Sequence, residues 1–440
     1  MPSGRMTARA RRDKAAAMST LAAPRDAASS PLLPAGVEII LDLSRLLSRT
    51  LHAMPTGIDR VELVYARQLL DLVPDRLRFA AVNPFGVYGR LPHAAVLRFL
   101  DETEARWAER AAPGRRAMTL AAARTLARLA PRPVPRPAPG VRRYYVQASP
   151  HHLHRPERVR AKLRAEQARF ICLVHDLIPI EFPEYARPNG AATHRLRIGT
   201  MAALADGLIA NSQATADSMA RFLTGTTPPP IRVAHLGCDP LPEGDDGPLP
   251  IPAPYFVVLS TIEPRKNHLL LLHVWRRMAE TLGPERTPHL AIVGRRGWEN
   301  ENVLDMLERC EAIRGHVHEL AGLSDRGVAA LLRNARALLL PSFAEGFGMP
   351  VTEALMAGTP AICSDLPALR EAGGAVPEFL DPLDGPAWAD MILDYAADRS
   401  ERRDRQMERL RGWTPPGWRG HIATVLDLVR ELDSGGSGGA

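Results

Sequence analysis

The feature that most constrains the fold of this chain is an alternation of short apolar runs with longer amphipathic segments, which occurs in two separate series. The apolar runs predict buried strands, and the amphipathic segments predict helices. Strands that alternate with helices pair in parallel, so each series predicts a doubly wound parallel sheet of the α/β class. We expect helices at Asp59–Leu72, Arg155–Ala168, Ala191–Ala205 and Leu269–Leu282. We expect strands at Glu38–Leu43, Leu77–Val82, Arg143–Gln147, Phe170–His175, Gly207–Asn211 and Ile231–Leu236, and in the second series at Tyr255–Ser260, His289–Val293, His316–Leu320, Ala337–Leu340 and Ala361–Ser364.

A proline-rich stretch separates the two series. Residues 239–254 contain six prolines and two glycines, a composition typical of a linker between domains. The chain of 440 residues is also long enough for two domains. We therefore predict a disordered basic extension at 1–36, a first domain at 37–240, a linker at 241–254, a second domain at 255–415, a last helix at 416–433 and a flexible tail at 434–440.

Residues 111–142 depart from the alternation. The part from Ala117 to Ala130 predicts a helix, and Pro131–Pro139 then alternates proline with basic and small residues. Two interpretations stay open. The segment is either a solvated connecting arm, or a basic surface element that holds the protein near anionic lipid.

The charge balance points to anionic partners. The 56 Lys and Arg residues exceed the 49 Asp and Glu residues, which gives a net charge of +7, and much of the excess lies in residues 5–25 and 110–143. A modest basic surplus favours attraction to phosphate groups or to an anionic membrane surface. Because no basic patch is interleaved with aromatic residues, we expect no nucleic-acid partner.

The cysteines and the apolar runs indicate a cytoplasmic protein. The four cysteines are widely spaced, without a Cys-x-x-Cys pair, so we expect neither a metal site nor a disulfide framework. No apolar run reaches the length of a membrane-spanning helix. The N-terminus lacks the apolar core of a secretory signal.

Two glutamates eight positions apart, Glu345 and Glu353, lie in the most informative stretch of the chain. The run before them predicts a buried strand, and the run after them predicts a helix with Pro350 at its start and Gly358 just past its end. A glycine loop at such a junction presents free backbone N–H groups and a positive dipole end, which attract phosphate. Carboxylates accept hydrogen bonds from sugar hydroxyls. The pattern indicates a nucleotide sugar, with two merely solvated glutamates as the alternative.

Three further junctions carry polar residues suited to the same ligand. Arg265 and Lys266 follow the first strand of the second series, where two cations can offset the charge of a diphosphate or can simply be solvated. His175 ends an apolar strand, at the edge where open α/β sheets bind ligands, although a histidine there is more often structural. Gly57 lets the backbone approach a ligand closely, unless the preceding Thr56 only caps a helix.

These motifs together resemble those of one enzyme family. Residues 341–360 (Pro-Ser-Phe-Ala-Glu-Gly-Phe-Gly-Met-Pro-Val-Thr-Glu-Ala-Leu-Met-Ala-Gly-Thr-Pro) resemble the E-x7-E signature of retaining glycosyltransferases of the family 4 type. Residues 263–267 (Glu-Pro-Arg-Lys-Asn) are similar to the turn that grips the donor diphosphate in this family, and residues 175–179 (His-Asp-Leu-Ile-Pro) to its histidine element. The chain departs from the family where many relatives carry Gly-Arg, because Leu259-Ser260 stands there. It also has one glycine, Gly57, where many have two.

The resemblance implies the GT-B fold, in which two Rossmann-like domains face a cleft and the last helix crosses back onto the first domain. It also implies front-face attack, in which the leaving phosphate draws the acceptor's proton and no protein nucleophile is used. The chain contains no Asp-x-Asp, the metal-clamping motif of the other main transferase fold. We therefore expect no metal and no cofactor besides the nucleotide-sugar donor, with cations neutralising the leaving diphosphate.

The resemblance assigns a role to each candidate residue. Lys266 and Arg265 stabilise the diphosphate, and Glu345 accepts hydrogen bonds from donor-sugar hydroxyls. Glu353 holds the ribose hydroxyls, and His175 orients the sugar or supports the positive charge at the anomeric carbon. The remaining positions contact donor phosphate or sugar through their backbone: Gly57, Phe347, Gly348 and Met349.

The function implied is hexosyl transfer, in the first place of mannose from GDP-mannose, to a saccharide or lipid-linked saccharide acceptor for surface polysaccharide. The basic segments would add peripheral contact with the inner face of the membrane. Other interpretations stay open. A phosphorylase needs a pyridoxal lysine and a longer chain, and an epimerase needs a cluster of acid/base carboxylates. A non-catalytic nucleotide-sugar-binding or scaffold protein would neither hydrolyse the donor nor transfer its sugar.

Overall fold

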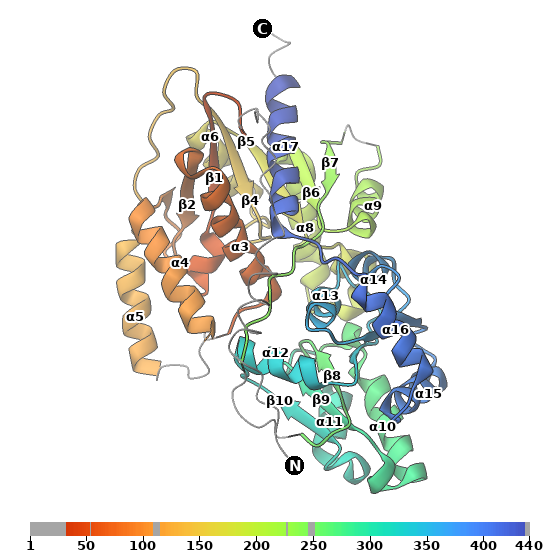
Figure 1. Cartoon of the computed structure of the whole chain (residues 1–440). Coiled ribbons are helices and arrows are strands. Elements are labelled where there is room, and N and C mark those ends of the chain that lie inside the picture. Colours follow the sequence, from red (N-terminus) through yellow and green to blue (C-terminus); the bar gives the residue numbers. More distant parts are fainter. Residues whose placement is uncertain (1–31, 53, 109–114, 226–227, 245–250, 436–440) are drawn as a thin grey trace, which may run out of the picture.

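The computed structural model describes residues 32–435, except for 53, 109–114, 226–227 and 245–250. It confirms the α/β class with two doubly wound sheets, which lie one above the other in Figure 1. The first sheet has the order β3-β2-β1-β4-β5-β6-β7 and the second the order β10-β9-β8-β11-β12-β13. The first sheet is built from β1 Val37–Asp42, β2 Leu77–Val82, β3 Tyr88–Arg90, β4 Arg142–Gln147, β5 Ala168–Val174, β6 Gly207–Ala210 and β7 Ile231–Val233. The second is built from β8 Tyr255–Leu259, β9 His289–Val293, β10 Val317–Leu320, β11 Leu338–Leu340, β12 Ala361–Ser364 and β13 Glu378–Leu380.

Helices cover both faces of each sheet, which explains why the central strands β8, β11 and β6 are apolar along their whole length. Helices of the first half are α2 Ser44–Ser48, α3 Gly57–Leu72, α4 His93–Ala108, α5 Arg115–Arg128, α6 Pro156–Glu166, α7 Ile178–Glu181, α8 Gly190–Leu204 and α9 Gln213–Phe222. Those of the second half are α10 His268–Leu282, α11 Glu301–Arg309, α12 Asp325–Asn334, α13 Met349–Met356, α14 Pro367–Gly373, α15 Gly385–Ala396, α16 Glu401–Arg411 and α17 Trp418–Gly435. Short 3₁₀ helices lie at Pro74–Arg76, Pro183–Tyr185, Pro264–Lys266, Pro284–Arg286 and Glu311–Ile313.

The structure corrects several expected boundaries. The helix expected to reach Ala168 ends at Glu166, because Gln167 adopts a left-handed conformation with φ 51° and β5 begins directly after it. Strands β3 and β13 were not expected, since three residues are too short to show a period. The last helix begins at Trp418 instead of residue 416 and includes Ser434 and Gly435, where we expected the tail to begin. Residues 436–440 and the first 31 residues of the expected extension lie outside the described residues.

The last helix, α17, lies against the first half of the molecule (Figure 1). Its apolar side chains Ile422, Val425 and Val429 belong to the first core, together with residues of α3. Farther along, Asp433 forms a 2.5 Å ion pair with Arg142 at the start of β4. Burial of this apolar face is the reason that the chain returns to the first sheet after completing the second.

The described part of the segment 111–142 is fastened to the first sheet. Helix α5 buries Ala122, Leu129 after it is buried as well, and an isolated β-bridge joins Arg132 to Arg90 of β3. Most of the other described side chains of this segment are exposed or half-buried, so it is a solvated segment that is anchored to the sheet, and its last residue, Arg142, already belongs to β4.

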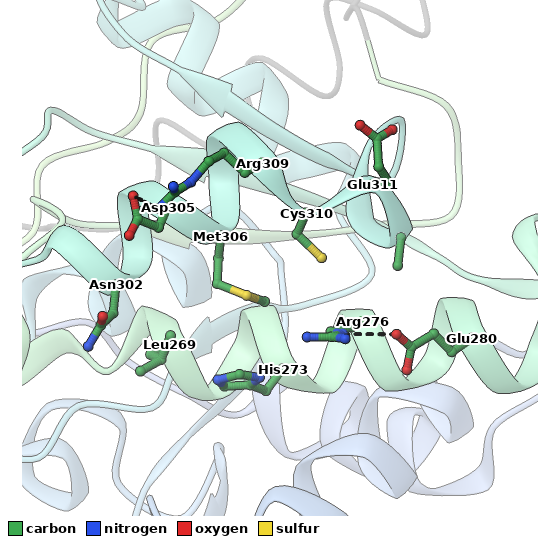
Figure 2. A pocket seen from close by; sticks show the side chains of 11 residues that line it. Leu269, His273, Arg276, Glu280, Asn302, Asp305, Met306, Arg309, Cys310 and Glu311 are labelled. Atoms are coloured by element: carbon green, nitrogen blue, oxygen red, sulfur yellow. Dashed lines mark hydrogen bonds and ion pairs between the residues drawn. The ribbon is translucent and has the colours of Figure 1, made fainter.

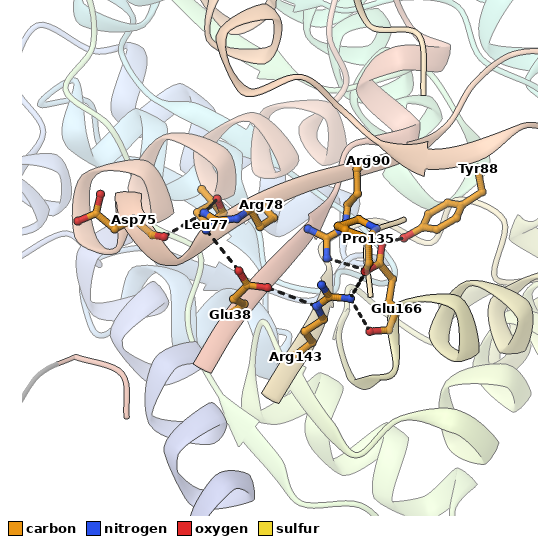
Figure 3. A network of polar contacts seen from close by, with 9 residues as sticks. All are labelled: Glu38, Asp75, Leu77, Arg78, Tyr88, Arg90, Pro135, Arg143 and Glu166. Carbon is orange, nitrogen blue, oxygen red and sulfur yellow. Dashed lines mark hydrogen bonds and ion pairs between the residues drawn. The ribbon is translucent and has the colours of Figure 1, made fainter. Parts of the chain in front are cut away.

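A buried network of charges holds this edge of the sheet together (Figure 3). The carboxylate of Glu166, which is fully buried, accepts two 2.7 Å hydrogen bonds from Arg90 and one of 2.8 Å from the Tyr88 hydroxyl. Arg143 lies 3.6 Å from the same carboxylate and donates to the carbonyl oxygen of Pro135 at 2.9 Å. The network therefore connects Pro135, in the segment 111–142, to β3, β4 and α6.

The two halves meet where the carboxyl ends of their strands face each other. A Cβ atom added to Gly346, in the loop after β11, would lie only 2.3 Å from the carbonyl oxygen of His175, after β5. The hydroxyl of Ser212 donates to the carbonyl oxygen of Gly346 at 2.6 Å. The carboxylate of Glu371 in α14 accepts from the N–H groups of Gln213 and Ala214 at the start of α9, at 2.5 and 2.9 Å. Backbone contacts therefore set the distance between the halves.

Replacing Glu166 by Gln should destabilise the first half strongly, because Arg90 would keep a buried charge without a carboxylate and Arg143 would keep only the longer 3.3 Å pair with Glu38. Breaking a buried ion pair in this way costs about 3–5 kcal/mol. The matched control is Glu102→Gln, which removes an exposed pair with Arg128 and should cost less than about 1 kcal/mol. Urea unfolding followed by circular dichroism measures both values, and similar midpoints for the two variants would contradict the network.

Gly346→Ala should push the halves apart, since the new methyl group would overlap the backbone of His175. We expect a larger radius of gyration in small-angle X-ray scattering, with the circular dichroism spectrum unchanged. The control is Gly199→Ala in α8, where an added Cβ meets no atom within 4 Å. This variant should have the same radius of gyration as the parent protein. Its free energy of unfolding should rise by about 0.5–1 kcal/mol, because alanine is a better helix former than glycine. Parent-like scattering by Gly346→Ala would refute the tight contact.

Candidate active site

The candidate residues gather at the carboxyl ends of both sheets. Glu345 follows β11, Lys266 ends the 3₁₀ helix after β8, and His175 follows β5. Ligands bind at this edge in open α/β sheets, because strand ends, loops and helix N-termini converge there. The tight contact between Gly346 and His175 brings the three positions to one region of the interface.

Glu345 pairs with both predicted cations. Its Oε1 accepts from Lys266 Nζ at 2.5 Å and from the Ser342 hydroxyl at 2.7 Å, and its Oε2 accepts from Arg265 Nη1 at 2.9 Å. Burial by itself would raise the pKa of Glu345, but the charges of Lys266 and Arg265 outweigh it and lower the pKa to about 2. The carboxylate is therefore ionised at any physiological pH and fixes the positions of both cations.

Lys266 and Arg265 differ in how many of their hydrogen-bond donors remain available to a ligand. Arg265 also pairs with Glu263 at 2.6 Å and donates to the carbonyl oxygen of Ala344 at 2.9 Å. Among the described residues, Lys266 Nζ has Glu345 as its one hydrogen-bond partner. An ammonium group has three donors, so Lys266 retains two for a ligand. Lys266 is thus better suited to hold a phosphate oxygen, and Arg265 to maintain the loop.

The loop before α13 offers backbone donors beside this cluster. Within the described part of the chain, the N–H groups of Phe347, Gly348 and Met349 donate to no other backbone group. Gly348 has φ 107°, and a Cβ there would lie 2.4 Å from Leu369, so the turn requires glycine. The Phe347 ring is buried in the first core and lies 5.6 Å from the ring of His235. The donors are therefore held in place at a helix N-terminus, where anions bind.

Glu353 lies in α13 next to an ion pair that joins the halves. Arg60 of α3 donates to Asp325 of α12 at 2.6 and 2.9 Å. Burial raises the pKa of Glu353 to about 7, against the charge of Arg60, which lowers it, and with a smaller raising contribution from the charge of Asp325. Below this pH the group is protonated and can donate as well as accept a hydrogen bond, which suits it to hydroxyl groups.

His175 is held as a neutral ring. Its Nε2 lies 2.7 Å from the carbonyl oxygen of Ala148, which can only accept, so Nε2 carries the proton and Nδ1 is an acceptor. Burial lowers the pKa of His175. Its own carbonyl oxygen accepts from Asn211 Nδ2 at 2.9 Å. The ring can therefore orient a sugar hydroxyl through Nδ1.

Gly57 begins α3 and faces α13. A Cβ added to Gly57 would meet the sulfur of Met349 at 3.8 Å, an ordinary contact, and the backbone there is not left-handed. The preceding Thr56 caps the helix in a capping box with Asp59. The structure thus shows the helix cap directly, and it requires no glycine at this position in the conformation seen.

Several residues of the site were not among the candidates. Ser342 and Ser212 position Glu345 and Gly346 through hydrogen bonds, and Ser212 also caps α9. Nothing in the sequence pattern indicated a role for Arg60 in the site, because its partner Asp325 is 265 residues away in the sequence.

Other parts of the molecule offer little competition as an active site. A cavity of about 760 Å³ lies between α10 and α11, lined in part by Leu269, Met306 and Cys310, with the Arg276–Glu280 pair along its rim (Figure 2). None of the candidate residues lines it.

Within the described residues, no group of three or more His, Cys, Asp or Glu side chains is placed to hold a metal ion. In the same residues, every helix is too short or too polar to span a bilayer.

Comparisons with known proteins agree with the resemblance. Residues 246–407 match the family described as Glycosyl transferases group 1. The serotype-specific mannosyltransferase WbdA of Escherichia coli is 28% identical over 230 residues, which is 48% of this chain and 27% of that protein. The O-antigen chain mannosyltransferase B of Escherichia coli is 36% identical over 149 residues, which is 34% of this chain and 38% of that protein. These matches therefore span well under half the length of both relatives.

A solved structure shows the same fold over almost the whole chain. The Anabaena protein Alr3699/HepE, in complex with UDP-glucose, superposes with a TM-score of 0.55 over 91% of this chain and 99% of that chain, at 14% sequence identity. The GT-B fold implied by the resemblance is thus confirmed.

Proposed function

We propose that this protein is a retaining, metal-independent glycosyltransferase that moves a hexosyl group from a nucleotide sugar to a saccharide or lipid-linked saccharide acceptor. The observation that carries the proposal is the arrangement of Glu345, Lys266 and the unpaired N–H groups of the loop before α13. The group 1 match and the two mannosyltransferases support hexosyl transfer in surface polysaccharide synthesis, with GDP-mannose as the first donor to test.

Charge stabilisation of the leaving diphosphate would be the main source of catalysis. Lys266 uses its two remaining donors on phosphate oxygens, and the N–H groups of Phe347, Gly348 and Met349 add fixed dipoles at the start of α13. Because these groups are already oriented in the folded protein, they need little reorganisation when charge develops. No metal ion is required for this step.

The state of Glu345 favours front-face attack over a covalent intermediate. A carboxylate with a pKa of about 2, bound to Lys266, Arg265 and Ser342, is a weak nucleophile. Glu345 instead positions the cations and keeps lone-pair capacity for a donor-sugar hydroxyl. His175 accepts from a second hydroxyl through Nδ1, and Glu353 engages the ribose. The leaving phosphate oxygen takes the acceptor's proton, and the acceptor oxygen forms the new glycosidic bond on the same face.

The donor class can be found by thermal denaturation with GDP-, UDP-, dTDP- and ADP-sugars. A ligand that binds only the folded state raises the melting temperature by mass action, so one nucleotide class should raise it most. Lys266→Ala should abolish this rise, whereas the exposed Arg276→Ala should keep it. No shift of the melting temperature with any nucleotide would contradict the proposed function.

In transfer assays, Lys266→Ala and Glu345→Ala should each lower kcat by about 10²–10³-fold. Near-normal turnover in both variants would also contradict the proposed function.

We further propose that exposed arginines on and after α5 bring the protein to an anionic membrane surface. These are Arg124, Arg128, Arg132 and Arg136. Each basic residue near an anionic bilayer adds about 1 kcal/mol, so replacing all four by Gln should weaken binding to phosphatidylserine vesicles at least about tenfold. The control replaces four exposed arginines of the second half: Arg399, Arg402, Arg405 and Arg411. Co-sedimentation measures both, and equal binding by the two variants would refute a role for α5.

A further inference from the structure

The first half carries a group of arginines beside His175 whose charges the protein does not balance. We call Arg45, Arg49 and Arg197 the arginine cluster. Arg45 lies in α2, Arg49 directly follows α2, and Arg197 lies in α8. Among the described residues, Asp59 is the one carboxylate that forms ion pairs with any of them, at 2.5 Å to Arg45 and 3.4 Å to Arg49.

The members of the arginine cluster lie within electrostatic reach of one another. Burial lowers the pKa of Arg197, and repulsion from Arg45 lowers it further, against the opposing charge of Asp176. Burial likewise lowers the pKa of Arg49. The charge of Asp59 opposes this effect, and repulsion from Arg45 and from Arg295, in the loop after β9 of the second half, adds to it. Since unit charges repel more strongly when they are partly buried, this arrangement costs free energy in the protein without a ligand.

The arginine cluster is close to the proposed reaction centre. The charge of Arg45 acts on His175 and lowers its pKa, after the larger effect of burial. It also acts on His151, which follows β4 at the same edge of the first sheet. The cluster therefore lies on the side of His175 that belongs to the first half, across the interface from Lys266.

A buried donor of the arginine cluster is left without an acceptor. The Nε atom of Arg197 is shielded from solvent and meets no acceptor within the described part of the chain. The Nε atom of Arg49 has Oδ2 of Asp59 at 3.4 Å, and Asp59 pairs more closely with Arg45. Arg197 has neither a hydrogen-bond partner nor an ion-pair partner among those residues, whereas Lys266 and Arg265 are matched by Glu345 and Glu263. Buried donors are rarely left unpaired in folded proteins, so an acceptor from outside the chain is the simplest partner.

We propose that the acceptor substrate carries a phosphate or diphosphate group, which Arg197 binds directly while Arg45 and Arg49 add their charge. Guanidinium groups suit phosphate, because their planar donors match its oxygens in pairs. The inference rests on the proposed function, which assigns the donor to Lys266 and the loop before α13 in the second half and so leaves the first half for the acceptor. It narrows the acceptor to two sources with the same chemistry, a free sugar phosphate and a saccharide linked to lipid through a diphosphate.

The test measures binding of anionic and neutral sugars with the donor site filled. Protein saturated with the nucleoside diphosphate found in the melting screen is titrated calorimetrically with mannose 1-phosphate and with mannose. Arg197→Gln should weaken mannose 1-phosphate binding at least about tenfold, since it removes a charge-assisted hydrogen bond, and should leave mannose unaffected. The matched control is Arg195→Gln, an exposed arginine of the same helix, which should bind both sugars like the parent protein.

Equal binding of mannose 1-phosphate by the parent protein and Arg197→Gln would overturn the proposal, and so would equal binding of mannose and its phosphate by the parent protein. Arg197→Lys should restore part of the affinity, which separates loss of charge from loss of folding. In transfer assays, Arg197→Gln should raise KM for the acceptor and leave KM for the donor unchanged. Mannose linked through a diphosphate to a short prenyl chain serves as the lipid-linked acceptor. If it binds more tightly than mannose 1-phosphate, the acceptor is a lipid-linked saccharide; if it binds more weakly, the acceptor is a free sugar phosphate.

The two proposals fail in different ways. If no nucleoside diphosphate raises the melting temperature, the donor site assigned to Lys266 is wrong. The titrations with mannose 1-phosphate and mannose are then repeated without nucleotide, and the difference between Arg197→Gln and Arg195→Gln still decides whether the arginine cluster is an anion site.

Discussion

The contact between Gly346 and the carbonyl oxygen of His175 is the constraint on which the site depends. Only a residue without a side chain leaves room for the two backbones at this distance. The residues on either side of Gly346 contact different halves of the molecule. Glu345 pairs with Lys266 and Arg265 of the second half, while Phe347 is buried in the core of the first. One short stretch of chain therefore joins the halves and positions the cations at their junction.

The two sides of this junction differ in charge balance. On the second half, Lys266 and Arg265 face Glu345 and Glu263, so the cations are held in position before any ligand arrives. This is the condition for electrostatic preorganisation, in which a site stabilises developing charge without moving. On the first half, the arginine cluster has Asp59 as its paired carboxylate and keeps a surplus of positive charge. A balanced site suits a charge that grows during reaction, and an unbalanced site suits a ligand that arrives already charged.

Much of the fold could be predicted because burial leaves a clear pattern in the sequence. Most strands of both sheets are largely apolar runs with helices on both sides, and the predicted runs correspond to β1, β2 and β4 to β12 within a few residues. The prediction failed where local chemistry overrides pattern. Gln167 ends α6 through a left-handed backbone, and β3 has three residues and is recognised only by its pairing with β2. The attachment of the segment after α5 to the sheet could not be predicted, because the buried Glu166 that organises this edge follows it in sequence.

The sequence by itself determined the class of fold, the division into two sheets and the positions proposed to bind a phosphate, because these depend on local periodicity and on short strand–helix junctions. Only the tertiary structure decided how those residues are paired. Glu345 and Lys266 are 79 residues apart, and Arg60 and Asp325 are 265 residues apart, so neither pair could be recognised before the halves were placed together. The ionisation of Glu345, the protonation of Glu353 and the surplus charge of the arginine cluster follow from burial and from neighbours in space. Electrostatic energy depends on distance and solvent exposure rather than on position along the chain, and folding alone sets these quantities.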